Sequence, residues 1–204
     1  MVRQYWRPSN MLYPVPPVLI SCADEEGNSN IMTAAWAGTI CSDPVMVSVS
    51  IRPERFSHDI IARTGEFVMN LTTRELAYAA DFCGVRSGRD IDKFAHLHLT
   101  KLPSRSVSAP SIGESPVCLE CVVEKIEELG THDLFIARVA AVSVDDRYLD
   151  EKGRFALEDA GLPITDENIF IAASCKEKGI LFLKDPSKAP MGCRFAEEAK
   201  PAAG

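Results

Sequence analysis

The chain has 204 residues, 46% of them hydrophobic, which is enough to bury the core of one domain of above-average size. Its 29 acidic residues outnumber the 22 basic ones, and the net charge of -7 argues against a general nucleic-acid or anionic-membrane role. No apolar run approaches the roughly 20 residues of a membrane span, and the start lacks the apolar core of a signal peptide. We therefore expect a single cytoplasmic domain over residues 1–204, with no nucleic-acid or membrane partner.

The seven cysteines form an odd set scattered through apolar stretches, unlike the paired framework of a small secreted domain. The one C-x-x-C, Cys118 to Cys121, lies in an alternating run where residues three apart point to opposite faces of a strand. A single C-x-x-C is also a poor zinc site. We expect reduced, buried or half-buried thiols and no metal site.

Strand patterns dominate the first part of the chain. A short buried strand is predicted over Val18–Cys22, and the polar turn at residues 23–29 leads into a second strand over Asn30–Gly38. After the turn at Asp43-Pro44, the alternating and β-branched run Val45–Ile51 predicts a third strand.

Helical spacing appears next. It predicts a short helix over Ser57–Arg63 that ends near Gly65, then a strand over Glu66–Leu71. A second helix is predicted over Thr73–Ala80, where Ala, Leu and Glu follow a Thr cap. A polar, glycine-bearing loop over residues 84–92 follows it.

Two long strands are predicted near the centre of the chain, after an irregular segment at residues 103–116. They run over Val117–Leu129 and Asp133–Val144, and Gly130-Thr131-His132 joins them. Short, closely spaced strands with small helices between them indicate a mainly β fold, an antiparallel β-barrel with α-helical additions.

Residues that suit a phosphate group gather after the third strand. A phosphate monoester is held best by Arg forks, hydroxyl groups and the free N–H groups of a helix start. Arg52, Arg55 and Ser57 offer these groups close together, with Ser57 placed as an N-cap or first-turn residue. The alternative is that both arginines are solvated surface charges and Ser57 only caps a helix.

Small side chains mark the second predicted strand. Met32, Ala34 and Trp36 share one face of it, while Thr33 and Ala35 share the other. Small residues let a planar ligand approach the backbone, whose polar groups can then read the edge of the ligand. Trp36 could stack on a ring; the alternative is a core or subunit-interface anchor.

An ordered series of motifs carries a family resemblance. Its members are Tyr13–Ser21, Asn30–Gly38, Asp43-Pro44, Arg52–His58, Ser87–Phe94 and Gly130–Asp133. Over residues 10–145 this series resembles the flavin reductase-like family, and within that family the chain looks closest to the flavoredoxin branch.

The resemblance implies an FMN-binding split antiparallel β-barrel of Greek-key type, with residues 10–145 as the barrel core and flavin near the boundary of a homodimer. FAD is the less favoured cofactor, and NAD(P)H is the expected co-substrate. Residues 32–36 would run along the isoalloxazine ring, residues 50–57 and Lys93 would hold the phosphate, and Phe94 would border the pocket. The implied cofactor-binding residues are Asn30, Met32, Thr33, Ala34, Ala35, Trp36, Ser50, Ile51, Arg52, Arg55, Ser57, Lys93 and Phe94.

His132 is the residue that the resemblance implies for chemistry, because the Gly-Asp-His turn of related reductases places its histidine near the nicotinamide side of the flavin. Here the turn reads Gly-Thr-His-Asp, so Thr131 replaces the Asp and an Asp–His pair within the turn does not carry over. The alternative is a turn histidine that bonds nearby backbone.

Residues 146–204 depart from the family pattern, since a highly charged run precedes a mostly apolar segment with a polar turn. We expect a C-terminal extension that caps the barrel or the dimer. The alternative is that it covers the flavin and sets substrate access.

The sequence thus predicts a flavoprotein oxidoreductase that takes electrons from NAD(P)H and passes them to free flavin, ferric iron or a redox protein partner. The cofactor would carry the chemistry, and the fold would orient it. A second hypothesis is an FMN-binding electron carrier without direct NAD(P)H reaction, since no Gly-rich dinucleotide fingerprint is present. The third is a split-barrel domain that has lost flavin, against which the joint presence of Thr33, Arg55, Ser57 and Lys93 argues.

Overall fold

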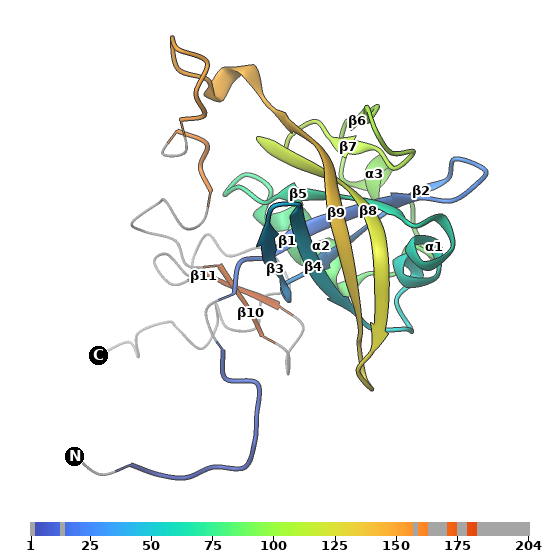
Figure 1. The fold of residues 1–204 in the computed structure, drawn as a ribbon, viewed down its shortest axis with the longest axis vertical. Coiled ribbons are helices and arrows are strands. Elements are labelled where there is room, and N and C mark those ends of the chain that lie inside the picture. Colours follow the sequence, from blue (N-terminus) through green and yellow to red (C-terminus); the bar gives the residue numbers. More distant parts are fainter. Residues whose placement is uncertain (1–2, 13–14, 157–158, 163–170, 175–178, 183–204) are drawn as a thin grey trace, which may run out of the picture.

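The computed structural model describes residues 3–12, 15–156, 159–162, 171–174 and 179–182. One antiparallel sheet of seven strands, in the order β2-β1-β5-β8-β9-β4-β3, dominates it, and three helices lie around the sheet (Figure 1). The sheet strands are β1 (Val18–Ala23), β2 (Ser29–Ala34), β3 (Ala37–Ser42), β4 (Val45–Ile51), β5 (Glu66–Leu71), β8 (Val117–Glu128) and β9 (Asp133–Val144). The helices are α1 (Phe56–Thr64), α2 (Ala77–Val85) and α3 (Lys93–His96). The prediction of a mainly β fold with α-helical additions is confirmed.

The strand order is that of a Greek key. β4 lies beside β9, although β5 and β8 come between them in the chain, and α1 is part of the long connection that makes this possible. The two long strands β8 and β9 pair from Val117↔Val144 to Glu128↔Asp133, as predicted. Their turn, residues 130–132, therefore projects beyond the end of the sheet.

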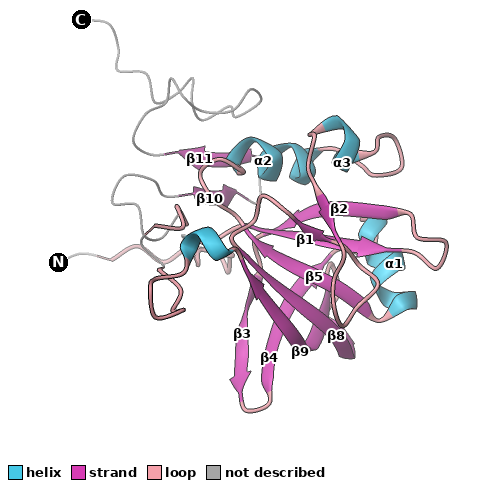
Figure 2. Cartoon of the chain, turned by 90° about the horizontal axis from the view of Figure 1, so that it is seen from above, coloured by secondary structure: helices cyan, strands magenta, loops and turns pink. Residues whose placement is uncertain are grey.

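The predicted strand over Asn30–Gly38 is wrong, because the chain bends at Ala35 and Trp36 and forms two strands there. β2 and β3 are opposite edges of the sheet in hydrogen-bond order, yet only this bend separates them in the chain. The sheet must curl until its edges meet, which gives a barrel (Figure 2). At the junction the Ser50 N–H donates to the Trp36 carbonyl at 2.8 Å.

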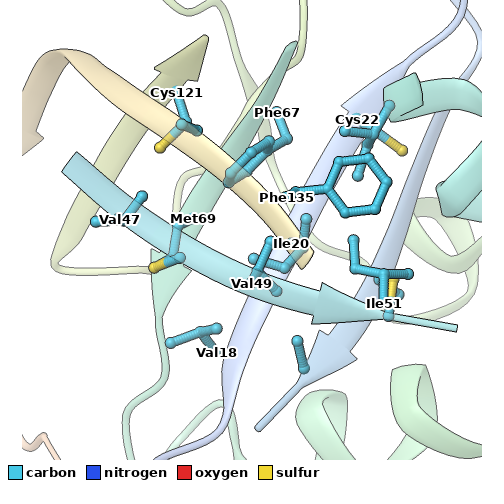
Figure 3. Packing of buried hydrophobic residues seen from close by; sticks show 14 of the residues in the cluster. Val18, Ile20, Cys22, Val47, Val49, Ile51, Phe67, Met69, Cys121 and Phe135 are labelled. Atoms are coloured by element: carbon cyan, nitrogen blue, oxygen red, sulfur yellow. The ribbon is translucent and has the colours of Figure 1, made fainter. Parts of the chain in front are cut away.

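The barrel interior is filled from six strands, as Figure 3 shows for the labelled side chains. Alternate residues of each strand point inward, for example Val47, Val49 and Ile51 of β4. α1 contributes Ile60 and Ile61 to the same cluster, so the helix is anchored in the barrel by its apolar face. This anchoring fixes where α1 begins.

Two smaller clusters cover parts of the outer surface. α2 and α3 pack over β1 and β2, where Leu19 and Ile31 meet Ala80 and Phe94. The loop between β6 (Lys101–Leu102) and β7 (Ser111–Ile112) covers β5 and β8 with its residues 107 and 109. Two short antiparallel strand pairs are also described, β6 with β7, and β10 (Ile171–Ser174) with β11 (Gly179–Phe182).

The helix predictions differ in accuracy. The first helix is confirmed to within one residue at each end, and Gly65 closes it with φ 70° and an N–H bonded to the Ile61 carbonyl. The second prediction, Thr73–Ala80, is shifted. Thr73 Oγ1 accepts the Leu76 N–H and holds a turn before α2, which then continues through Gly84 into the predicted loop.

The five cysteines that the structure describes are free thiols, and Cys175 and Cys193 lie outside the described residues. Cys118 and Cys121 belong to different clusters on opposite faces of β8, as predicted. Burial raises the pKa of Cys22 to about 11 and those of Cys83 and Cys121 to about 12. These three thiols therefore stay protonated at neutral pH.

Part of the predicted C-terminal extension is described, namely residues 146–156 and 159–162 and the β10–β11 hairpin. It begins with a 3₁₀ turn over Asp146–Tyr148, and β11 lies beside α2 (Figure 2). Its capping role remains a prediction. Among the helices in the described part of the chain, none is long and apolar enough to cross a membrane.

Candidate functional site

Segments far apart in the sequence meet at the bend that closes the barrel. The ring centroids of Trp36 and His132 lie 4.6 Å apart, with the planes tilted by 37°. The N–H of Ser50, the last residue but one of β4, donates to the carbonyl of Trp36, and Arg52 is the first residue after the strand. Three parts of the predicted site are thus neighbours in space: the strand expected to bind the ring, His132, and the start of the segment expected to bind the phosphate.

The start of α1 has no side-chain cap from its N-cap residue. Arg55 occupies the N-cap position but its side chain makes no capping bond, and of the first-turn N–H groups that of His58 donates to the Arg55 carbonyl at 2.9 Å. Instead, Arg55 Nη1 donates to the Gly84 carbonyl at 3.0 Å. Ser57 is the second helical residue, which confirms the first-turn position and excludes the N-cap position.

Asn30 ties β2 to this helix start. Its Nδ2 donates to Ser57 Oγ at 2.8 Å, and both side chains are buried. The loop after α2 packs closely against this contact. A Cβ at Gly88 would lie 2.1 Å from Asn30 Oδ1 and 2.8 Å from Phe56 Cδ1. Only a residue without a side chain fits at this position in the loop.

Arg89 lies next to the start of α1. It was named from the sequence only as part of the motif Ser87–Phe94 and was not among the predicted site residues. Its Nη1 donates to the Glu54 carbonyl at 3.1 Å, and its guanidinium lies 5.3 Å from the centroid of the Phe56 ring. The Ser-Gly-Arg-Asp motif was the signal that marked this loop. Arg52 is exposed and pairs with Glu54 at 2.6 Å, a contact that water screens.

Lys93 is buried between β2 and α2. Its Nζ donates to the carbonyls of Ile31, at 2.7 Å, and Cys83, at 3.1 Å. Burial lowers the pKa of this amine, and an ammonium group has three N–H donors, of which these carbonyls take two. Thr33 Oγ1 also donates to the Ala80 carbonyl, so two side chains hold β2 against α2.

The remaining predicted residues divide by burial. Met32, Ala34 and Ile51 point into the barrel core, so only their backbone can meet a ligand, while Phe94 is buried in the cluster beneath α2 and α3. Ala35, Trp36 and Ser50 are half-buried. The open part of the site is therefore the bend and the helix start.

His132 is placed beside positive charge. Burial lowers its pKa first, and the nearby Arg52 lowers it further. Its Nδ1 lies 3.0 Å from the Thr131 hydroxyl, so the residue that replaces the expected Asp still offers a hydrogen-bond partner. The neutral imidazole is thus favoured next to Trp36.

Comparisons with known sequences agree with this geometry. A family model described as "Flavin reductase like domain" matches residues 11–158. An uncharacterized protein of Archaeoglobus fulgidus is 36% identical over 141 residues, which is 69% of this chain and 78% of the relative. The NADH-dependent flavin reductase StyB of Pseudomonas fluorescens is 28% identical over 138 residues, 67% of this chain and 75% of StyB.

Solved structures show the same architecture. The flavoredoxin of Desulfovibrio vulgaris (Miyazaki F) is 28% identical, and the match covers 89% of this chain and 93% of the flavoredoxin chain, with a TM-score of 0.75. An FMN-binding protein from Thermus thermophilus, solved with bound 1-cyclohex-2-enone, is 27% identical, with coverage of 76% and 86% and a TM-score of 0.66. The chain belongs to the flavin reductase-like family, and its likeness is to the flavoredoxin branch.

The Gly88→Ala variant is expected to lose about 1–3 kcal/mol of unfolding free energy, because the new methyl group would displace Asn30 from Ser57. Chemical denaturation measures this loss. The matched control is Gly38→Ala, where a Cβ meets nothing within 4 Å, and its change should stay within about 0.5 kcal/mol. Equal stability of the two variants would contradict the close packing of the loop.

The pKa of His132 is expected to lie below the ordinary 6.5. The unfolded chain then binds the proton more tightly, so the stabilisation from this group is complete above the unfolded pKa and is lost as the pH falls toward the folded one. An NMR titration of the His132 ring protons measures the shift. Arg52→Ala should raise this pKa, whereas the exposed Arg63→Ala should not; an ordinary pKa in the wild type would show that the ring is well solvated.

Proposed function

We propose that this member of the flavin reductase-like family binds FMN at the barrel junction and acts as an oxidoreductase that takes electrons from NAD(P)H. Free flavin, ferric iron or a redox protein would accept them. The observation that carries the proposal is the convergence of an uncapped helix start, next to Arg55, with the Trp36–His132 pair. The first suits a phosphate and the second an aromatic ring.

The helix start fits the phosphate of FMN. The N–H groups of its first two residues, the Arg55 guanidinium and the Ser57 hydroxyl are the kinds of donor that bind a dianion best. Lys93 has a third N–H donor beyond its two carbonyl partners, and Arg89 adds a further cation next to Phe56. These residues concentrate positive charge on a chain of net charge -7.

The edge of β2 fits the flavin ring. β2 is an edge strand, and an edge strand presents unpaired N–H and C=O groups that a heterocycle can bond. Lys93 and Thr33 hold this strand in place from behind, and Ala35 leaves room for a flat ligand. The backbone thus provides a rigid polar edge without a bulky side chain.

Bound FMN would supply the hydride and electron chemistry, as cofactors do in this class of enzyme. The chain's task is then to bind, orient and exclude water. The Trp36 indole limits access of water from one side, and His132, held neutral by its lowered pKa, can exchange a hydrogen bond with a group on the ring or on a nicotinamide. The relatives support this assignment, since one is named an NADH-dependent flavin reductase and another an FMN-binding protein.

The homodimer belongs to the same proposal. β3, β4 and β9 carry the apolar residues Ile40, Val45 and Val142, each about half-exposed, and β3 and β4 lie on the side of the barrel away from α2 and α3 (Figure 2). A second copy would cover these residues. Sedimentation equilibrium should therefore give twice the chain mass, and a monomer at all concentrations would refute the dimer.

Absorbance spectroscopy tests the proposed activity. The apo-protein, incubated with FMN and desalted, is expected to retain flavin absorbance, and anaerobic NADH or NADPH is expected to bleach it. Bound flavin that neither nicotinamide reduces would support the alternative of an electron carrier, which the lack of a Gly-rich dinucleotide motif favours. A protein that retains no flavin would refute both.

Arg55→Ala is expected to weaken FMN binding by about 1–3 kcal/mol, the usual loss for a charge-assisted hydrogen bond. Titration of apo-protein with FMN measures the change. Arg63→Ala, at the exposed end of the same helix, is the matched control and should bind FMN normally. Lys93→Ala should weaken binding similarly and also destabilise the fold, because it leaves the carbonyls of Ile31 and Cys83 without a donor. If Arg55→Ala binds FMN with unchanged affinity, the Arg55 side chain bonds only to the Gly84 carbonyl and does not hold the phosphate.

A further inference from the structure

His58 and Asp133 form a well-shielded polar contact that the proposed site does not use. His58 Nε2 lies 2.8 Å from Asp133 Oδ2, and each side chain is only 12% exposed. The imidazole meets the Phe135 ring edge-on, with centroids 5.3 Å apart, and Phe135 is fully buried in the barrel core. The histidine therefore rests on a rigid surface and points at the carboxylate.

The contact joins the two ends of the proposed flavin site. His58 lies in the first turn of α1, directly after Ser57. Asp133 is the first residue of β9, directly after His132, and its backbone pairs with Ile51 at the end of β4. One end of the bond thus belongs to the phosphate side and the other to the turn that carries His132.

We propose that His58 and Asp133 are positioning residues that hold the turn at residues 130–132 against the start of α1, so that the His132 ring stays against Trp36. This inference rests on the proposed function for its catalytic consequence. The structural part, that the pair sets the place of His132, is independent of any bound cofactor.

A simple stabilising role does not explain the pair well. Burying an imidazole and a carboxylate costs desolvation energy, which an apolar contact of the same size would avoid. Ile60 and Ile61 already anchor α1 in the barrel core. What a directional bond adds is a fixed distance and orientation between the helix and the turn, and catalysis depends on such positioning.

Neighbouring contacts make His132 sensitive to this bond. The Leu129 N–H donates to the His132 carbonyl at 3.0 Å and closes the turn, and Thr131 is exposed. Asp133 is the residue through which the turn enters the sheet. Loss of its side-chain anchor would leave the His132 ring free to move away from Trp36.

Tryptophan fluorescence of the cofactor-free protein tests the structural part. The chain has two tryptophans, so a Trp6→Phe background leaves Trp36 as the only tryptophan, which excitation at the red edge of the indole band selects over tyrosine. His132→Ala removes the ring next to the indole and should therefore change the emission of Trp36 in intensity or wavelength. We expect His58→Ala and Asp133→Ala to change the emission in the same direction, although neither residue belongs to the Trp36–His132 pair.

Two further variants are the controls for this measurement. Asp59→Ala removes the exposed carboxylate 3.2 Å from the other ring nitrogen of His58, and it should keep the wild-type emission. Asp133→Asn keeps an oxygen acceptor for His58 and should keep it as well. If His58→Ala and Asp133→Ala are folded by circular dichroism and either retains wild-type emission, the positioning role is wrong; if one fails to fold, the other decides.

The rate of flavin bleaching by nicotinamide, at saturating FMN, tests the catalytic part. His58→Ala is expected to be roughly tenfold slower than wild type, the scale of a small misplacement of a reacting group. In a His132→Ala background the same change should have no additional effect, because the pair acts through His132. An equal loss in both backgrounds would overturn the inference. Absence of bleaching in the wild type would instead refute the proposed activity and leave the fluorescence result standing.

Discussion

The closure of the sheet at Ala35 and Trp36 is the constraint on which the rest of the structure depends. Two residues connect the first and the last of the seven strands in the hydrogen-bond order, so the sheet has to curl until β2 and the β3–β4 hairpin meet. The bond from Ser50 to Trp36 seals this junction. This closure brings three segments to one rim of the barrel: the end of β4, the start of α1 and the turn before β9. The candidate site is that rim.

Polar contacts rather than apolar packing define the rim. Lys93, Asn30 and Ser57 are buried there, and each has a hydrogen-bond partner in a different segment of the chain. Such groups cost free energy to bury, and they repay it only in one arrangement, because a displaced donor or acceptor is left unsatisfied. The apolar barrel below provides stability, whereas the polar rim selects a single geometry for the backbone of β2.

The sequence predicts elements whose pattern is local and misses those set by long-range closure. Val45–Ile51 and Glu66–Leu71 were predicted to the residue, since period-two alternation records which side chains meet the core. The bend after Ala34 was missed because small residues continue across it without a change in pattern. The family resemblance marked Lys93 but not its burial between β2 and α2. The His58–Asp133 contact spans 75 positions, and no local pattern encodes it.

The buried thiols have a consequence for a member of the flavin reductase-like family. Cys22 lies against the Asn30 backbone at the site, and its pKa of about 11 keeps it as the thiol, the form that neither attacks disulfides nor adds to electrophilic rings. Cys83 and Cys121 are insulated in the same way. These three buried thiols would therefore offer no competing route for oxidation if the proposed flavin is bound at the rim.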